Sequence, residues 1–455
     1  MKLRASVVVL ALLARVSVAE PTPTAPPAHR AMPTYNGRDD APTTAGDVAR
    51  GVLRVVLFPI RVVVDYGIRW PIGKTISFAE HSHGVRAALR YLFLLPPTPT
   101  PTIFPIAFYD FGFQSSIGVR VLWTRGFLTP GSRLSLKLGN GGADWWRADG
   151  NLLVAAPKRF RGFHAGIDGA LRHRPDQQFF GLGPRSPQSA AARYTQTRMT
   201  VSGFVGFREL SFFAASTETF TGSSNFNGRL SIEDQVSAGR IAAEPAGYGA
   251  FVVTRRYGGK LALDTRGIRP NTEERDRTTS GARIDAVLEH VRDREIGEWL
   301  HLDATLGGAL RLDTVKEHKL DVRMRIELIE PTATTTAAAI PFVELASIGG
   351  SRDLRGFASG RGRDLSAAAF MIDYQWPIAA WLDATLYLGA GNVFGHNLSG
   401  LTAGKLRGSA GMGVALAGLS ADRELEAWAA FGTDPFDQGA DVNSFRLVLG
   451  YSHDY

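Results

Sequence analysis

The 455-residue sequence predicts an all-β protein, an antiparallel transmembrane β-barrel of about 16 strands with a helical segment in front of it. Two observations carry this prediction: segments of about ten residues in which apolar and polar side chains alternate, and an export signal at the N-terminus. Alternation alone is also typical of a soluble β-sandwich, whose apolar faces pack on each other. Aromatic residues near the strand ends favour the barrel, because such residues suit the two membrane–water interfaces. They are Trp123, Trp145, Trp146, Tyr374, Trp376, Trp381 and Tyr451.

The first 46 residues are expected to lie outside any folded domain. Residues 1–19 resemble a secretory signal peptide, since Lys2 and Arg4 precede an apolar stretch that ends in the small residues Ser, Val and Ala. Residues 20–46 are rich in Pro, Thr and Ala, a composition that predicts a disordered linker. The chain has no Cys, so the sequence excludes both disulfide bonds and a lipoprotein anchor.

Residues 47–102 are predicted to form a periplasmic helical segment that ends in a Pro-rich connector. Val48, Val52 and Val55 recur at helical spacing, and Asp47 is suited to cap the first helix. The apolar face of this segment, flanked by arginines, either lies on the membrane interface or packs against the barrel mouth. No uninterrupted apolar stretch long enough for a membrane-spanning helix follows the signal peptide.

Residues 103–455 are assigned to the barrel, because they leave room for about 16 strands at roughly 22 residues per strand and connection. The clearest strands lie after residue 300. Leu300, Leu302, Ala304 and Leu306 fall on one face, and His301, Asp303 and Thr305 fall on the other. A following strand alternates Val322, Met324, Ile326 and Leu328 with Asp321, Arg323, Arg325 and Glu327. In a barrel the apolar faces meet lipid, and the charged faces form a hydrated ionic network in the lumen. Two long polar connections, residues 222–233 and 266–281, are expected to face the cell exterior.

A stretch rich in arginine and glycine interrupts these strands and supplies the candidate site. Glycine lets a loop fold tightly, and a guanidinium that leaves bulk solvent needs a carboxylate or water, so the stretch suits a polar cavity. The candidate loop residues are Arg355, Gly356, Phe357, Arg361 and Arg363. An acidic and aromatic strand, residues 370–378, follows the stretch and ends in Trp376-Pro377-Ile378.

Together the loop and the strand after it resemble the Arg-Gly-Phe/Tyr signature of the BamA/TamA superfamily of outer-membrane proteins, also called the bacterial surface antigen family. Residues 179–183 are similar to an aromatic-Gly-x-Gly segment of the same family. The resemblance implies a 16-stranded barrel with one extracellular loop folded into its lumen. It also implies that the loop arginine, here Arg355, meets acidic residues of the inner wall.

Alternation identifies two candidate wall partners. Asp373 shares a face with Met371 and Gln375, opposite Phe370, so the Asp373 side chain should point into the lumen. Asp383 points inward by the same count and is a possible substitute partner for Arg355. The next strand of the family usually carries an Asp shortly before a Gly, whereas this chain has Gly389 at that place. One anionic partner is therefore expected to be missing.

Two functions, besides that of a structural or adhesive barrel, remain open at this stage. The first is a BamA/TamA-type barrel without POTRA modules, which assists the insertion of outer-membrane proteins or rearranges lipids through a weak seam between its first and last strands. The second is a passive pore or transporter with a constricting in-folded loop. The sequence indicates no catalytic residues, metal site or cofactor, and it predicts that the protein is not an enzyme. The net charge of +8 is mixed with acidic residues, which argues against nucleic acid as a partner. Expected partners are outer-membrane lipids and either nascent outer-membrane proteins or a periplasmic accessory, at the bacterial outer membrane.

Overall fold

The computed structural model describes residues 101–123, 128–142, 144–157, 160–265, 280–312, 318–333, 335–379, 382–416 and 425–451. The predicted signal peptide (1–19), the linker (20–46) and all but the last two residues of the helical segment (47–102) lie outside these ranges, as do Trp381 and residues 452–455. Within the described ranges, no helix is long and apolar enough to cross a membrane.

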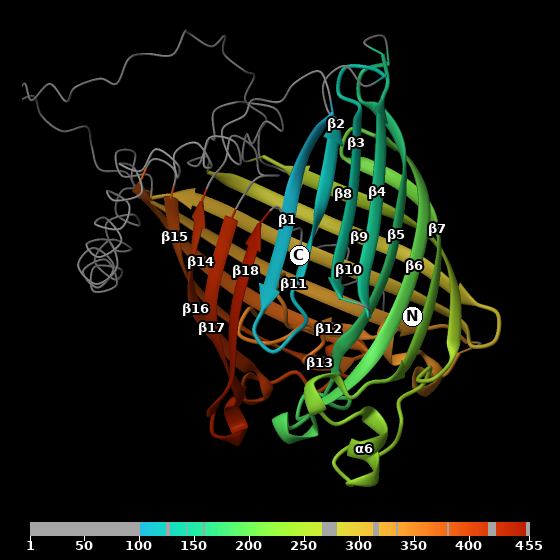
Figure 1. Cartoon of the computed structure of the whole chain (residues 1–455), viewed down its shortest axis with the longest axis vertical. Coiled ribbons are helices and arrows are strands. Elements are labelled where there is room, and N and C mark those ends of the chain that lie inside the picture. Colours follow the sequence, from blue (N-terminus) through green and yellow to red (C-terminus); the bar gives the residue numbers. More distant parts are fainter. Residues whose placement is uncertain are drawn as a thin grey trace, which may run out of the picture. The chain divides into compact units, whose positions relative to one another are not determined.

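Sixteen antiparallel strands form a closed barrel, as the sequence predicts (Figure 1). The first eight are β1 (Thr102–Asp110), β2 (Ser116–Trp123), β3 (Arg133–Gly142), β4 (Trp145–Ala155), β5 (Phe163–Phe179), β6 (Ala192–Phe207), β7 (Leu210–Ser223) and β8 (Phe251–Asp264). The other eight are β9 (Gly281–Asp293), β10 (Gly297–Arg311), β11 (Lys319–Pro331), β14 (Ser366–Ala379), β15 (Leu382–Phe394), β16 (Arg407–Leu416), β17 (Leu425–Pro435) and β18 (Val442–Tyr451). Each strand pairs with its neighbours along the chain, and β1 meets β18 to close the ring.

Short elements occupy the connections at the barrel end shown lowest in Figure 1. The strands β12 (Ala346–Ile348) and β13 (Gly362–Asp364) form a separate two-stranded sheet between β11 and β14. The helices are α6 (Ile232–Ser237) and the 3-10 turns η3 (Gln188–Ala190), η4 (Phe226–Gly228), η5 (Ala337–Ala339), η6 (Phe342–Glu344), η7 (His396–Leu398), η8 (Ala403–Lys405) and η10 (Phe436–Gln438). Helix α6 begins with a capping box, in which Ser231 and Asp234 exchange side-chain and backbone hydrogen bonds.

The expectation that both long polar connections face the same side is wrong. Residues 222–233 lie in the connection from β7 to β8, and residues 266–281 span the connection from β8 to β9. Because β8 is antiparallel to both neighbours, these connections join opposite ends of β8. Length and polarity identify connections, but only their order along the chain determines which barrel end each one occupies.

The predicted alternation of faces is confirmed on β10 and β11. Leu306 pairs in register with Met324, and these side chains point outward with exposed fractions of 42% and 43%. On the alternate positions, Asp303 pairs with Glu327 and both side chains face the interior of the barrel. The closed ring gives every strand a paired neighbour on both edges, as a β-protein in lipid requires. The outward side chains of β10 and β11 are apolar and therefore suit contact with lipid.

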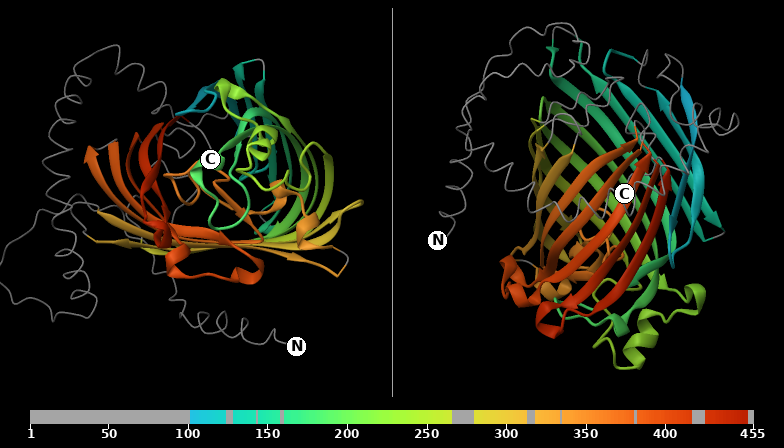
Figure 2. Two further views of the ribbon diagram at one scale, coloured as in Figure 1. Left: turned by 90° about the horizontal axis from the view of Figure 1, so that it is seen from below. Right: turned by 90° about the vertical axis from the view of Figure 1, so that its left-hand side faces the viewer.

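An apolar core lies inside the barrel, at the end where the long connections gather. Its members include Trp299 of β10 and Tyr387 of β15 from the wall, and Phe342, Ile348 and Phe357 from the connection between β11 and β14. All five side chains are at most 2% exposed. Figure 2, seen from below in its left view, shows this connection within the ring of strands. The connection therefore folds inward, as the family resemblance implies for one loop.

The outward face can be tested with Leu306→Arg. A charge on a lipid-facing strand near the bilayer centre lowers the free energy of unfolding by about 2–4 kcal/mol. Urea unfolding in lipid vesicles, followed by the mobility difference between boiled and unboiled samples on gels, measures this change. Leu306→Met is the control and should change stability little. Equal stability of the arginine variant, or recovery of the wild type as a soluble protein, would contradict a membrane-facing surface.

Candidate functional site

The candidate site is the lumenal loop, defined as residues 332–365 between β11 and β14, together with the wall that it contacts. The turn of this loop at Gly356 lies against the last strands of the barrel. The Gly356 N–H donates to Ser409 Oγ of β16 at 2.9 Å, and Ser444 Oγ of β18 donates to the Gly356 carbonyl at 2.7 Å. A Cβ at this position would lie 2.0 Å from the carbonyl oxygen of Phe431 on β17. Only glycine allows the loop backbone to approach the wall this closely.

Arg355 points to the wall beside this turn. Its Nη1 lies 2.5 Å from Oδ1 of Asp373 on β14, so the ion pair expected from the sequence is present. The Arg355 guanidinium also stacks on two aromatic rings, at 4.0 Å from the ring centroid of Trp428 and 4.7 Å from that of Tyr387. A planar cation between rings and beside a carboxylate has a fixed orientation. These contacts hold the loop against β14, β15 and β17.

Asp373 forms ion pairs with two arginines. Its Oδ2 lies 2.5 Å from Nη2 of Arg323 on β11, in addition to the contact with Arg355. The structure does not bring Asp383 to this group. On β15, Tyr387 is opposite Asp373, whereas Asp383 is opposite Pro377, four positions and about 13 Å along the strand. Among the carboxylates of the described residues, Asp373 alone forms an ion pair with Arg355.

Gly389 replaces the Asp that the resemblance predicts, and the structure gives a physical reason for the smaller residue. A Cβ on Gly389 would lie 2.3 Å from the hydroxyl of Tyr387 and 3.0 Å from a methyl group of Leu354. That hydroxyl donates to the Asp353 carbonyl at 2.7 Å and accepts from the Arg355 N–H at 3.3 Å. The space that an acidic side chain would fill is therefore taken by an apolar and hydrogen-bonded contact with the loop.

Phe357 anchors the same turn by packing. Its ring is fully buried, and a Cβ on Gly432 of β17 would lie 2.3 Å from it. Two glycines on opposite sides of one contact, Gly356 in the loop and Gly432 in the wall, thus allow the loop to pack directly on β17. Burial of an aromatic ring contributes roughly 2 kcal/mol or more to such packing.

Arg361 and Arg363 hold the loop to the connection between β5 and β6. The Arg361 guanidinium donates to the hydroxyl and the carbonyl of Ser186 at 3.0 and 2.9 Å, and it stacks 4.5 Å from the ring centroid of Phe180. The Gly183 N–H donates to the Arg363 carbonyl at 3.0 Å. The structure therefore brings together residues 179–183 and the arginine-rich stretch, two of the three segments on which the family resemblance rests. Burial, together with the nearby charge of Arg407, lowers the pKa of Arg361 to about 9.

A buried ionic network continues from the loop into the wall. Arg325 of β11 donates to Asp353 of the loop at 2.9 Å, to Glu327 at 2.6 Å and to Asp303 of β10 at 3.2 Å. Burial raises the pKa of Asp353, although the charge of Arg325 opposes this shift. His301 contacts Glu327 at 3.0 Å. The sequence predicts a network of wall charges, but its alternation pattern gives no sign that Asp353 of the loop joins this network.

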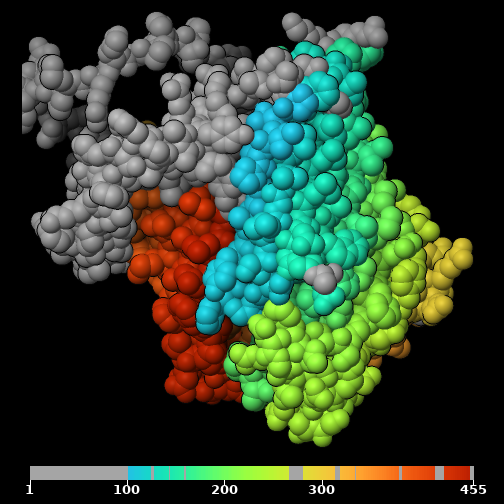
Figure 3. Space-filling view, viewed as in Figure 1, coloured from blue at the N-terminus to red at the C-terminus, as the bar shows by residue number. Residues whose placement is uncertain are grey.

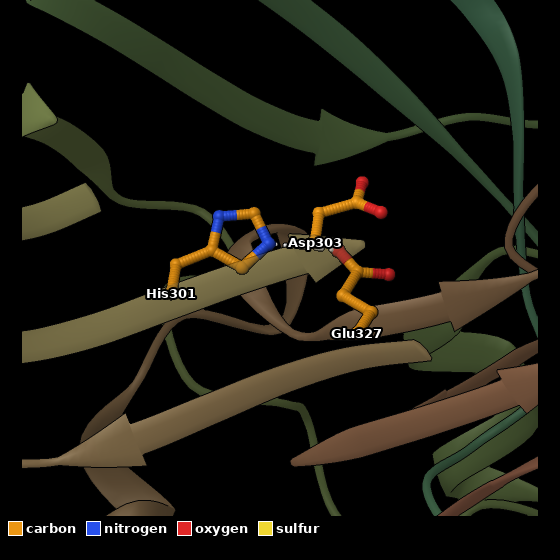
Figure 4. A group of neighbouring side chains, drawn as sticks. All are labelled: His301, Asp303 and Glu327. Atoms are coloured by element: carbon orange, nitrogen blue, oxygen red, sulfur yellow. Dashed lines mark hydrogen bonds and ion pairs between the residues drawn. The ribbon is translucent and has the colours of Figure 1, made fainter. Parts of the chain in front are cut away.

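His301, Asp303 and Glu327 offer the donor types of a metal site (Figure 4). The Arg325 guanidinium already lies between the two carboxylates, and it would repel a second cation. The arrangement is better described as an ionic network than as a metal site. The network extends through Glu289, which contacts His301 at 2.6 Å and Arg256 at 2.6 Å, and on to Glu344 of the loop.

The seam between β1 and β18 is the second part of the site. Only four residue pairs join the two strands in the described part of the chain, from Ala107 opposite Tyr451 to Asp110 opposite Val448. Thirteen pairs join β10 and β11. At the end of the pairing, Arg446 donates to Asp110 with Nε at 2.9 Å and Nη2 at 2.8 Å. Figure 3 shows the blue first strand against the red last strands.

Comparison with known proteins gives similarity of structure only. No protein-family model matches the chain, and no curated protein matches it in sequence. The solved structures that resemble it include BamA from Haemophilus ducreyi lacking POTRA domains 1–3, at a TM-score of 0.49 and 15% identity over 78% of this chain and 70% of that chain. CdiB from Acinetobacter baumannii has a TM-score of 0.47 and 10% identity over 78% of this chain and 60% of that chain. The outer membrane protein OprD from Pseudomonas aeruginosa has a TM-score of 0.31 and 11% identity over 77% and 93% of the respective chains.

The close approach at Gly356 predicts that Gly356→Ala lowers the free energy of unfolding by about 1–3 kcal/mol, because the new methyl group forces the loop off the wall. Gly169→Ala on β5 is the matched control, since nothing lies within 4 Å of its ideal Cβ. Urea unfolding measures the stability, and limited proteolysis measures exposure of the loop. Equal effects of the two alanines would contradict the proposed contact.

Because two arginines share Asp373, substitutions in this group should lower the stability of the protein by different amounts. Asp373→Asn removes the one carboxylate that pairs with Arg355 and one of the two that pair with Arg323, and it should lower the free energy of unfolding by about 3–5 kcal/mol. Arg355→Gln leaves Asp373 paired with Arg323, so its cost should be smaller, about 1–3 kcal/mol. Asp437→Asn removes a more exposed ion pair with Arg185 and should cost less than about 1 kcal/mol. Urea unfolding of the three variants decides the order, and a larger cost for Arg355→Gln than for Asp373→Asn would refute it.

Proposed function

We propose that this protein is a bacterial outer-membrane barrel of the BamA/TamA type, which assists the insertion of outer-membrane proteins or rearranges lipids by opening its β1–β18 seam. The short seam is the observation that carries the proposal. Among the described residues, which end at Tyr451, four residue pairs join β1 to β18, whereas seven join β1 to its other neighbour, β2. Fewer backbone hydrogen bonds make this the weakest place in the ring of described strands.

The geometry of β18 adds to this argument. The pairing with β1 ends at Val448, and the Phe111 N–H then donates to the Leu447 carbonyl at 2.9 Å. Beyond that bond, residues 442–446 of β18 have no strand partner on the β1 side among the described residues. An unpaired strand edge is a template on which another strand can add. A nascent barrel strand is the partner that we propose for this edge.

The lumenal loop supports an opening at the seam rather than elsewhere. Gly356 contacts β16, β17 and β18 through Ser409, Phe431 and Ser444, and it therefore binds the last three strands to the interior of the barrel. When β1 separates from β18, the loop can keep the last strands in place. The barrel would then open at one edge without losing its internal core.

A passive pore remains the second candidate, because one lumenal cavity favours it. This cavity has a volume of about 370 Å³, and its lining includes seven arginines, which would attract anions. Each of these arginines, however, also pairs with a carboxylate, as Arg147 and Arg172 do with Asp149. The loop core also fills the lumen beside the cavity.

A disulfide across the seam provides the direct test. Tyr109 and Leu449 are opposite each other in register, at a spacing that suits a disulfide, and the natural chain has no Cys to interfere. The double variant Tyr109→Cys with Leu449→Cys should lose at least about tenfold of its activity when oxidised, because the seam can no longer open, and reduction should restore it. The assay is assembly of an added barrel client in liposomes, measured together with ion conductance.

The matched control is Leu306→Cys with Met324→Cys, which joins two fully paired strands on the wall. Its oxidation should leave client assembly unchanged. Equal client assembly with and without the protein, combined with a steady large conductance, would reject the insertion function and support the pore.

A further inference from the structure

A second cavity lies beside the open edge of β18. Its volume is about 280 Å³. It is bounded by residues 111–113 after β1, by residues 443–446 of β18, and by Ala358 and Arg361 of the lumenal loop. Four arginines line it, namely Arg193, Arg229, Arg361 and Arg446, and its lining contains no carboxylate. This composition separates it from the lumenal cavity described above, where each arginine has an acidic partner.

Three of the four arginines have no ion pair within the described residues. Arg193 donates Nη2 to the Gly112 carbonyl at 2.6 Å and Nη1 to the backbone carbonyl of Asp176, and it stacks 4.4 Å from the ring centroid of Phe113. Arg361 contacts Ser186 and Phe180, which are uncharged. The fourth arginine, Arg446, pairs with Asp110. The cavity therefore carries an excess of positive charge.

Two buried donors on this lining lack acceptors. The Nε of Arg361 and the Nη1 of Arg446 have no hydrogen-bond partner in the part of the chain that the structure describes, and the two residues are 1% and 7% exposed. A buried guanidinium donor without an acceptor costs free energy, on the order of 1–3 kcal/mol. An anion in the cavity would supply the missing acceptors and offset the charge.

The outer rim of the cavity is apolar. Phe111 is 58% exposed and Phe445 is 49% exposed, and the Phe445 ring lies 5.1 Å from that of Phe431 on the outward face of β17. Guanidinium groups bind phosphate through paired hydrogen bonds, and aromatic side chains beside them suit an acyl chain. The site thus combines a cationic interior with an apolar edge.

We propose that this cavity binds a phosphate group, which belongs either to an anionic lipid headgroup or to free phosphate. The four arginines hold the phosphate oxygens, and the phenylalanine rim contacts the lipid chain when the ligand is a lipid. The site does not depend on whether the barrel inserts other proteins. Because it contacts β18 and the residues after β1, its ligand would lie beside the seam.

The test uses the full-length protein in a neutral detergent with three probes: phosphatidylglycerol, phosphatidylcholine and inorganic phosphate. Native mass spectrometry measures bound lipid, and titration calorimetry measures bound phosphate. Arg193→Gln with Arg229→Gln should weaken phosphatidylglycerol binding by about tenfold, because two charge-assisted contacts are lost. Arg229→Gln alone, which removes an exposed guanidinium without an ion pair in the described chain, should weaken it by about threefold and decides the case if the double variant does not fold.

Arg294→Gln is the control, since Arg294 is exposed at the same end of the barrel and does not line the cavity. Its affinity should equal that of the wild type. Preference for phosphatidylglycerol over phosphatidylcholine, with competition by inorganic phosphate, identifies a lipid headgroup. Binding of inorganic phosphate alone, weakened by the same substitutions, identifies free phosphate. Absence of both, or equal binding by the cavity variants and Arg294→Gln, overturns the site.

Discussion

A strand surrounded by lipid must pair both of its edges, because no water is present to satisfy its backbone groups. This constraint explains why the sixteen strands close into a ring, and it makes the β1–β18 seam the place on which the rest of the structure depends. The seam joins the strands through only four described residue pairs. The buried ion pair between Asp110 and Arg446 strengthens it at one end. A short β1–β18 pairing that is strengthened by one ion pair can close the ring and still allow the two strands to separate.

The lumenal loop compensates for the short seam from inside. Glycine at position 356 allows backbone contact with β17, and hydrogen bonds from the same residue reach β16 and β18. Arg355 of the loop also pairs with Asp373 of β14, and Asp353 of the loop pairs with Arg325 of β11. The loop therefore ties the C-terminal strands to the centre of the barrel. Residues on both sides of the seam also form the cationic cavity, which places a proposed phosphate site where opening would occur.

The sequence was most informative where a property repeats along one strand. Alternation predicted which side chains of β10 and β11 face the interior, and it turned Asp373 of β14 toward the lumen, where the family resemblance implied that Arg355 would meet it. Alternation gave Asp383 the same inward direction. It does not tell how far along the strand a residue lies, and Asp383 is four positions away from the level of Asp373. Contacts between distant segments were not predictable. Arg446 and Asp110 meet across 336 residues, because closure of the ring brings the two ends together.

Backbone hydrogen–deuterium exchange in lipid nanodiscs tests the weak seam most directly. Amides that open locally exchange in proportion to the free energy of that opening. We expect β1 and β18 to exchange much faster than β10 and β11, with the fastest exchange in residues 442–446, whose β1-side edge lacks a described strand partner. Equal protection of the seam and of the β10–β11 pair would contradict it.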